Sequence, residues 1–277
     1  MIISVFDHHI CSLGEGLFWN KCLGAPFWFD IKNGLMLSQN CEVTAHWQFD
    51  FAVSSGYAIN KRSVMIASEI GLIVYDLDTD TKKLVVPVEK DNHKTRSNDG
   101  RVDPWGGYWF STMRKEAQES AGSIYRYYRG EIHKLFQGLT IPNSICFSSK
   151  TNEVFFSDTA QQIVWKQRLD EKGFPVGDRH VFLDLKGSDY LPDGAVCDEN
   201  GYLWIAIWGA GLVSVFDGVG RQLFDIELGV PNVTCPLICE GYLFVTSATE
   251  GLSTHQLEQY PDSGKTFQID IGARSCV

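Results

Sequence analysis

A short pattern recurs along this chain with different letters but the same order of residue types. Each copy places a small polar or acidic residue ahead of a short apolar strand, then a tight turn, then a second strand rich in aromatic residues. The copies are GEGLFWN at Glu15, SNDGRVDPWGGYWFST at Asn98, IPNSICFSSKTNEVFFSDT at Asn143, LPDGAVCDENGYLWIAIW at Asp193 and VPNVTCPLICEGYLFVTSA at Asn232. The last four are spaced by 45, 50 and 39 residues, a period that is typical of propeller blades.

The interval of 83 residues between Glu15 and Asn98 leaves room for one weaker copy, best placed at QFDFAVSSGYAIN near Phe51. Six units then account for the chain, which predicts an all-β fold, a six-bladed β-propeller. No Pro/Ser-rich linker or low-complexity stretch divides residues 1–277, so we expect one domain. A pair of all-β sandwiches is the alternative architecture, but it does not explain the regular period.

Strand signals rich in β-branched and aromatic residues run from one end of the chain to the other. Tight hairpin turns are indicated at IKNGLM, YYRGEI, DENGYL and FDGVGR. No window shows a sustained helical period, and the polar stretch 114–122 is predicted to be a loop. The expected strands are 25–31, 63–68, 71–77, 83–88, 107–113, 123–128, 153–158, 163–169, 202–208, 212–217 and 242–248. We also expect the N-terminal strand 2–6 to close the ring by joining the last blade near 267–272.

The innermost strands of a propeller run along its central channel, so residues at their starts converge at one end of it. Glu15, Asn98, Asn143 and Asp193 hold equivalent places in the repeat and should meet there. Two carboxylates and two amide oxygens suit a hard divalent cation. A single Asn or Asp in such a place is more often a turn former, but four in register favour a functional site. The pattern therefore predicts a metal site at the mouth of the central channel.

Charge and composition restrict the partners. The chain carries 24 basic and 34 acidic residues, a formal net charge of −10, without a run of lysine or arginine. This balance argues against nucleic acid and against a membrane surface as partners. The stretch 1–13 has neither a basic region nor a long apolar segment, which favours a cytoplasmic protein. We expect a monomer that acts on a small molecule.

Eight cysteines show no C-x-x-C pair and no matching histidine spacing. Several of them fall in apolar strand segments, where a free cysteine behaves as a small hydrophobic residue. A disulfide framework is unusual in a chain of this size that lacks an export signal. The sequence therefore predicts reduced thiols rather than disulfides or a zinc site.

Taken together, the motifs resemble those of the SMP-30/gluconolactonase/regucalcin-like family of six-bladed propellers. The matching phrases, in family order, are GEGLFWN, RSNDGRVDPWGGYWFSTM, IPNSICFS, LPDGAVCDENGYLWIAIWGAG and CPLICEGYLFVTSA, and they extend over nearly the whole chain. The resemblance implies that Glu15, Asn143 and Asp193 bind one divalent metal ion. It also implies hydrolysis of an aldono-1,4- or 1,5-lactone to the aldonic acid.

The same resemblance implies substrate contacts. Arg96 and Asn98, which precede the D-G-[KR]-x-D-P motif, match the family's substrate-binding Arg and Asn. A further substrate-contacting Glu precedes the GSIY strand, and Glu119 is the residue chosen for this role, with Glu116 and Gln118 as alternatives.

The residue chemistry suggests a division of roles. A bound metal would polarise the lactone carbonyl, and Asp193 is the expected general base for the attacking water. Arg96 and Asn98 would position the substrate. Asp99 is interpreted as a turn residue rather than a ligand.

A calcium-binding regulatory protein without essential catalysis is the alternative function, because the same oxygen cluster could hold calcium without chemistry. The presence of Arg96 and Asn98 favours the enzyme, since a calcium site alone has no use for a substrate-binding arginine. A strictosidine-synthase-like or paraoxonase-like propeller is a third option, but no catalytic histidine pair is visible. The metal can be Ca, Zn, Mn, Mg or Fe(II), since carboxylate and amide ligands accept each of them.

Overall fold

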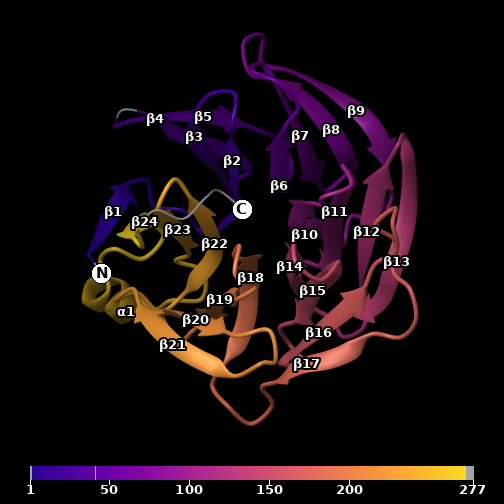
Figure 1. Ribbon diagram of the computed structural model, residues 1–277. Coiled ribbons are helices and arrows are strands. Elements are labelled where there is room, and N and C mark those ends of the chain that lie inside the picture. The colour runs from indigo at the N-terminus through magenta and orange to yellow at the C-terminus, as the bar shows by residue number, and fades with distance from the viewer. Residues whose placement is uncertain (1, 41, 273–277) are drawn as a thin grey trace.

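The computed structural model describes residues 2–40 and 42–272. Six antiparallel sheets of four strands each stand in a ring around a common axis (Figure 1). The protein is an all-β, six-bladed β-propeller, as the repeat predicts.

Five blades take four consecutive strands, ordered from the axis outward. They are β2 (Gly14–Asn20), β3 (Ala25–Asp30), β4 (Leu35–Asn40), β5 (Val43–Gln48); β6 (Val53–Ala58), β7 (Ser63–Ser68), β8 (Gly71–Asp76), β9 (Thr81–Pro87); β10 (Thr95–Val102), β11 (Tyr108–Arg114), β12 (Gly122–Tyr128), β13 (Glu131–Leu139); β14 (Pro142–Ser148), β15 (Glu153–Asp158), β16 (Ile163–Arg168), β17 (His180–Asp184); β18 (Leu191–Cys197), β19 (Leu203–Trp208), β20 (Leu212–Phe216), β21 (Gln222–Glu227). The sixth blade consists of β22 (Val233–Cys239), β23 (Tyr242–Ser247), β24 (Thr266–Asp270) and, outermost, β1 (Ile3–Asp7).

The two ends of the chain close the ring. β1 pairs antiparallel with β24, with Ile3 opposite Ile269, and Figure 1 shows the two strands side by side. Asp7, at the end of β1, is buried and its Oδ2 accepts a hydrogen bond of 2.9 Å from Gln39 Nε2 in the first blade. The predicted closure by the N-terminal strand is therefore confirmed.

The strands predicted from residue type are confirmed within two residues at each end, and 63–68 and 153–158 coincide with β7 and β15. The weak copy near Phe51 is β6. The stretch between β11 and β12 is a loop, as predicted.

The apolar core lies between neighbouring blades. One cluster joins the first and second blades through Phe29, Ile66 and Tyr75. Another joins the fifth and sixth through Trp204 and Ile238. Polar residues lie at the ends of the inner strands rather than between the packed sheets. The candidate site forms at these strand ends.

One element differs from the sequence prediction. A short helix, α1 (Thr254–Gln259), follows β23, although no helical period marks this stretch. Ser253 and Gln256 form a capping box at its start, and this local hydrogen bonding stabilises a helix without a buried face. Among the described residues, the structure contains no helix long and apolar enough to cross a membrane.

The cysteine prediction holds only in part. Among the described residues, free thiols are found at Cys11, Cys22, Cys146, Cys197 and Cys235. Burial raises the pKa of the Cys197 thiol to about 12, which keeps it protonated and inert. Cys239 is disulfide-bonded, so the prediction of reduced thiols is wrong there. The spacing of cysteines along the chain does not predict which of them lie close together in the fold. Cys41 and Cys276 lie outside the described residues.

Candidate functional site

Every inner strand carries a β-bulge near its start, and the predicted site residues lie at or beside these bulges. A bulge interrupts the regular alternation of side chains and can turn one of them towards the axis. The register shifts between Val53 and Ser55 in β6 and between Val233 and Pro236 in β22. In the other inner strands it shifts between Glu15 and Phe18, Ser97 and Gly100, Asn143 and Cys146, and Pro192 and Ala195.

The residues after Glu15 and Asn143 share an unusual backbone conformation. Gly16 has φ 63° and Ser144 has φ 57°, both in the left-handed region that favours glycine. At Gly16 a Cβ atom would lie 2.1 Å from the Ser54 carbonyl oxygen of the next blade, so only glycine fits. Ser144 is held by its hydroxyl, which donates to the Asp193 carbonyl oxygen. Serine is disfavoured in this conformation whereas glycine adopts it freely, so the backbone strain lies beside Asn143 and not beside Glu15.

Glu15, Asn143 and Asp193 come together in the structure, and each is at most 6% exposed. The Glu15 and Asp193 carboxyl groups share a hydrogen bond. Burial and the nearby Asp99 raise the pKa of Glu15 to about 8. Burial and the charge of Glu15 raise the pKa of Asp193 well above its ordinary value. Two buried carboxyl groups packed this closely oppose each other's ionisation, and the guanidinium group of Arg96 offsets this only in part.

Asn98 joins the predicted substrate residue Arg96 to this cluster. Arg96 Nη1 donates to Asn98 Oδ1 at 2.7 Å, and Asn98 Nδ2 donates to Asn143 Oδ1 at 2.9 Å. Asn143 Nδ2 in turn donates to Thr159 Oγ1 at 2.9 Å. This chain fixes the orientation of the Asn143 amide and leaves its oxygen one lone pair for a further partner. Arg96 is 9% exposed, so it is part of the buried site rather than a solvated side chain.

Two further residues adjoin the cluster. Asp99, interpreted from the sequence as a turn residue, is buried, and its carboxylate accepts from the Gly100 N–H at 2.8 Å and the Ile145 N–H at 2.6 Å. Arg101 Nη2 donates to the Ala195 carbonyl oxygen at 2.9 Å, so its side chain reaches from β10 to β18. Both lie in the D-G-R continuation of the Asn98 motif, which is the signal that could have pointed to them.

The charges of this region are unbalanced. Three carboxyl groups, those of Glu15, Asp99 and Asp193, interact with the guanidinium groups of Arg96 and Arg101. Two carboxylate groups and one oriented amide oxygen form a donor set suited to a hard or borderline divalent cation. The residues therefore fit the metal that the family resemblance implies.

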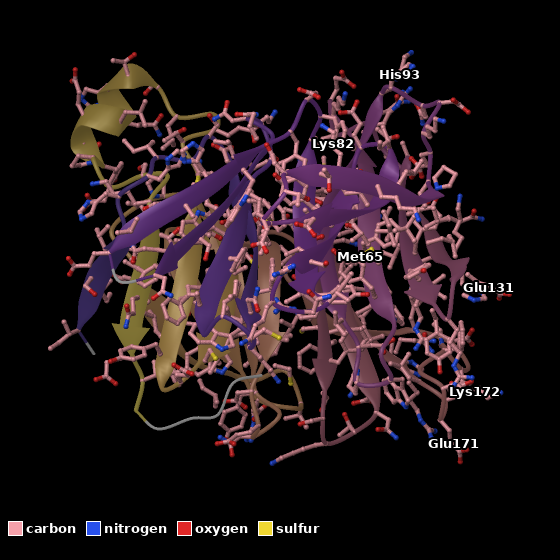
Figure 2. The ribbon with its side chains drawn as sticks, turned by 90° about the horizontal axis from the view of Figure 1, so that it is seen from above. Met65, Lys82, His93, Glu131, Glu171 and Lys172 are labelled. Atoms are coloured by element: carbon pink, nitrogen blue, oxygen red, sulfur yellow. The ribbon has the colours of Figure 1, made fainter. Side chains whose placement is uncertain are left out.

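A groove with a volume of about 380 Å³ begins at Arg96. It is lined by Ile31, Lys32, Asn33, Gly34, Phe49, Asp50, Phe51, Ala52, Glu69, Arg96 and Lys115. Asp50 lies 3.1 Å from Lys82, and Figure 2 shows Lys82 and His93 on the face opposite Glu171 and Lys172. We call this lined space the entry groove.

The loop between β11 and β12 contributes Lys115 to the entry groove. Glu119, the residue chosen from the sequence, is exposed in the same loop, as are Glu116 and Gln118. None of the described hydrogen bonds joins Glu119 to the cluster residues.

A second cavity, of about 610 Å³, lies further along the inner strands. Its lining includes residues from five inner strands: Leu17, Tyr57, Arg101, Phe147 and Val196. This cavity is therefore separate from the entry groove, and the carboxylate cluster does not line it.

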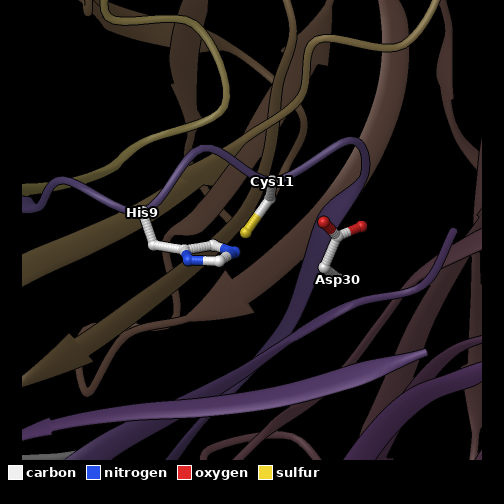
Figure 3. Close-up of side chains that lie close together, drawn as sticks. All are labelled: His9, Cys11 and Asp30. Carbon is white, nitrogen blue, oxygen red and sulfur yellow. The ribbon is translucent and has the colours of Figure 1, made fainter. Parts of the chain in front are cut away.

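A second group of potential ligands consists of His9, Cys11 and Asp30, which lie close together (Figure 3). Asp30 accepts from the N–H groups of Ser12 and Leu13 and from Asn33 Nδ2 at 2.7 Å. Asp158 has the same arrangement, accepting from the N–H groups of Thr140 and Ile141 and from Gln161 Nε2 at 2.8 Å. Asp30 therefore accepts hydrogen bonds from the backbone that precedes the inner strand of its blade, as Asp158 does in another blade. This structural role requires neither histidine nor cysteine.

Fold and site together define a six-bladed propeller with a buried, oxygen-rich cluster at one end of its inner strands. The family model described as "SMP-30/Gluconolactonase/LRE-like region" matches residues 13–249. The protein belongs to the SMP-30/gluconolactonase/LRE-like family.

Relatives of known name agree with this assignment. A Rhizobium meliloti protein described as a candidate sugar lactone lactonase is 32% identical over 266 residues, covering 94% of this chain and 90% of its own. The pentonolactonase XacC of Haloferax volcanii is 27% identical, covering 95% of this chain and 92% of its own. The crystal structure of a calcium-binding protein, regucalcin, from Agrobacterium tumefaciens superposes with a TM-score of 0.95 at 34% identity, covering 98% of this chain and 94% of its own.

Proposed function

We propose that this protein is a metal-dependent sugar lactonase, a carboxylic ester hydrolase that opens an aldono-1,4- or 1,5-lactone to the aldonic acid. The buried pair of Glu15 and Asp193 carries this proposal, together with Arg96, which interacts electrostatically with both carboxyl groups and is hydrogen-bonded through Asn98 to the Asn143 amide oxygen. A carboxyl pair with only a structural role would not require an arginine such as Arg96, which also lines a groove. The names of the relatives support the same reaction class.

Each residue has a role that its chemistry allows. A divalent ion bound by Glu15, Asn143 and Asp193 would supply Lewis-acid polarisation of the lactone carbonyl. Asp193 accepts a proton from the water that attacks the carbonyl carbon, and it returns that proton to the ring oxygen as the C–O bond breaks. Arg96 donates hydrogen bonds to the substrate and holds it in place.

Asn98 has a more restricted role than a free amide would have. Its Nδ2 group donates to Asn143 Oδ1 and to the Pro142 carbonyl oxygen at 3.1 Å, so both hydrogens are used. Its Oδ1 atom accepts from Arg96 and keeps one lone pair. Asn98 therefore contacts substrate only as an acceptor for a hydroxyl, and its main effect is to align Arg96 with Asn143.

The test is the release of acid from a panel of aldonolactones, followed at constant pH. Chelator-treated protein should be inactive, and at least one of Ca, Zn, Mn, Mg or Fe(II) should restore hydrolysis. Arg96→Ala should lower kcat/KM by about 10- to 100-fold while metal affinity stays nearly unchanged. Lactone hydrolysis that is absent with every metal would overturn the proposal.

Calcium binding without catalysis is the second candidate, favoured by the calcium-binding regucalcin whose fold this chain shares. Only two of the three proposed ligands, Glu15 and Asp193, are carboxylates, which disfavours tight calcium buffering. Calorimetry on the stripped protein separates the two functions. Nanomolar calcium affinity together with no metal-restored hydrolysis would favour the regulatory protein.

A further inference from the structure

The entry groove and the carboxylate cluster share one wall, the side chain of Arg96. This guanidinium group interacts electrostatically with Glu15 and Asp193 and also lines the groove. A lactone whose carbonyl lay at the cluster would have Arg96 between its ring and the groove. Resting on the proposed function, we propose that the entry groove binds the exocyclic hydroxylated chain of the lactone and that Lys115 determines the preferred chain length.

Lys115 is held firmly at the groove. Its Nζ lies 2.5 Å from Glu69 Oε1, and the other carboxylate oxygen, Oε2, accepts a hydrogen bond of 3.4 Å from the Ala52 N–H. Glu69 thus links the Lys115 loop to the segment between the first two blades. The Lys115 side chain remains 38% exposed, so its ammonium group keeps donors for a ligand. A positioned donor binds a hydroxyl with little loss of side-chain entropy.

The groove's charges favour a neutral polyol over an anionic chain. Both lysines that line it are paired, Lys115 with Glu69 and Lys32 with Glu250 at 2.6 Å. Paired ammonium and carboxylate groups offer donors and acceptors together, which matches hydroxyl groups that both donate and accept. A phosphate or carboxylate would have to displace these anions.

The walls and size of the groove suit the same ligand. Phe49 and Phe51 line it with their rings 6.2 Å apart, and aromatic surfaces pack against the C–H groups of a carbon chain. A volume of about 380 Å³ is within the range of small-molecule sites. It can hold a short hydroxylated chain beside the lactone ring.

Aldono-1,4-lactones of four, five and six carbons test this directly, because their exocyclic chains grow from none to one to two hydroxylated carbons. The wild-type protein should prefer the six-carbon lactone. Lys115→Met should lower kcat/KM for that lactone about tenfold, mainly through KM, and leave the four-carbon lactone unchanged. Lys115→Arg should keep most of the preference because it retains the donor.

Lys83→Met is the matched control, since Lys83 is an exposed lysine on β9 that does not line the groove. It should leave all three rates unchanged. Equal losses of all three lactones in Lys115→Met, or an unchanged preference, would overturn the role of Lys115 while leaving the lactonase proposal intact. A wild-type protein that hydrolyses none of the lactones with any metal overturns both.

Discussion

The Glu15 and Asp193 carboxyl groups are buried side by side, which opposes their joint ionisation. Burial and Asp99 raise the pKa of Glu15 from 4.5 to about 8, and burial and Glu15 raise the pKa of Asp193. Between pH 4.5 and about 8 the folded, metal-free protein keeps the Glu15 carboxyl group protonated, whereas the unfolded chain has released this proton. A bound divalent cation would remove the need for these protons.

The metal-free protein should therefore lose stability as pH rises. The contribution of Glu15 is fully present below pH 4.5 and is lost as pH rises through about 8, because the folded state binds more protons over this range. The free energy of unfolding should fall by up to about 1.4 kcal/mol per pH unit for one proton. Urea unfolding in chelator at several pH values measures it.

Glu15→Gln provides the control, because a neutral amide cannot titrate; the slope should become smaller, and the part that remains comes from the buried Asp193. Saturating divalent metal should flatten or reverse it in the wild-type protein. Stability that rises with pH in chelator would show that the two carboxyl groups are already compensated.

At the residue scale the repeat predicts that the starts of the inner strands converge, and the structure places Glu15 beside Asp193 and Asn98 beside Asn143. Glu15, Asn143 and Asp193 are neighbours because the bulged strand starts converge, and that follows from the repeat alone. The neighbourhood of Asp99 and Arg101 does not follow from it. Asp99 is turned inward by the bulge and Arg101 extends to the Ala195 carbonyl oxygen, and neither direction is encoded in spacing.

At the scale of strands, the bulges of the inner strands bring neighbouring blades into close approach at the site. Gly16 follows Glu15 within such a bulge, has φ 63°, and has no room for a Cβ atom beside the Ser54 carbonyl oxygen. This contact between Gly16 and the Ser54 carbonyl oxygen sets how closely the first and second blades approach each other. The position of the Glu15 carboxyl group depends on it as well.

Gly16→Ala should lower stability by about 2–4 kcal/mol, because it adds steric overlap to an unfavourable φ. Gly130→Ala is the matched control, since Gly130 has φ 88° but open space around its Cβ position. It should lower stability by only about 1 kcal/mol. Chemical denaturation of both variants gives the comparison, and equal losses would show that the blade contact at Gly16 can relax.

Predictability of the elements depends on burial. The middle strands read clearly because they are apolar on both faces; every residue of β3 is buried. Most outer strands are exposed and mixed in composition, as β21 is, and residue type did not predict them; β9 and β1 are the exceptions. The helix α1 has no buried residues, so only its capping box could have indicated it.

At the scale of the whole molecule, one strand from the N-terminus completes the last blade. β1 covers the edge of β24, and Asp7 links that blade to the first through Gln39. Without β1 the ring would end in an exposed strand edge.

Deletion of residues 1–7 should lower Tm by about 10 °C or more and cause light scattering at raised concentration. The control is a chain that begins at residue 3, which keeps all of β1. Thermal unfolding of the two chains decides it. Equal Tm values would mean that the ring does not need this strand.

The repeat predicts the ring and its closure, because each blade needs neighbours to bury its faces. The entry groove could not be predicted in the same way. Apart from Arg96 on β10, its lining comes from turns and loops between strands, and the Glu69 to Lys115 pair joins residues from two blades at 2.5 Å. Such loop contacts depend on how the blades are placed, which the repeat period alone does not specify.

The proposal that Glu15, Asn143 and Asp193 hold the metal required for lactone hydrolysis is tested most directly by one titration. Metal is added to chelator-stripped wild-type protein and to Asp193→Asn, and the initial rate of acid release from an aldonolactone is followed. The wild-type rate should rise from near zero to a plateau at one metal ion per chain. Asp193→Asn, folded by circular dichroism, should remain near zero throughout. Hydrolysis by the stripped wild-type protein, or a similar plateau in Asp193→Asn, would contradict the proposal.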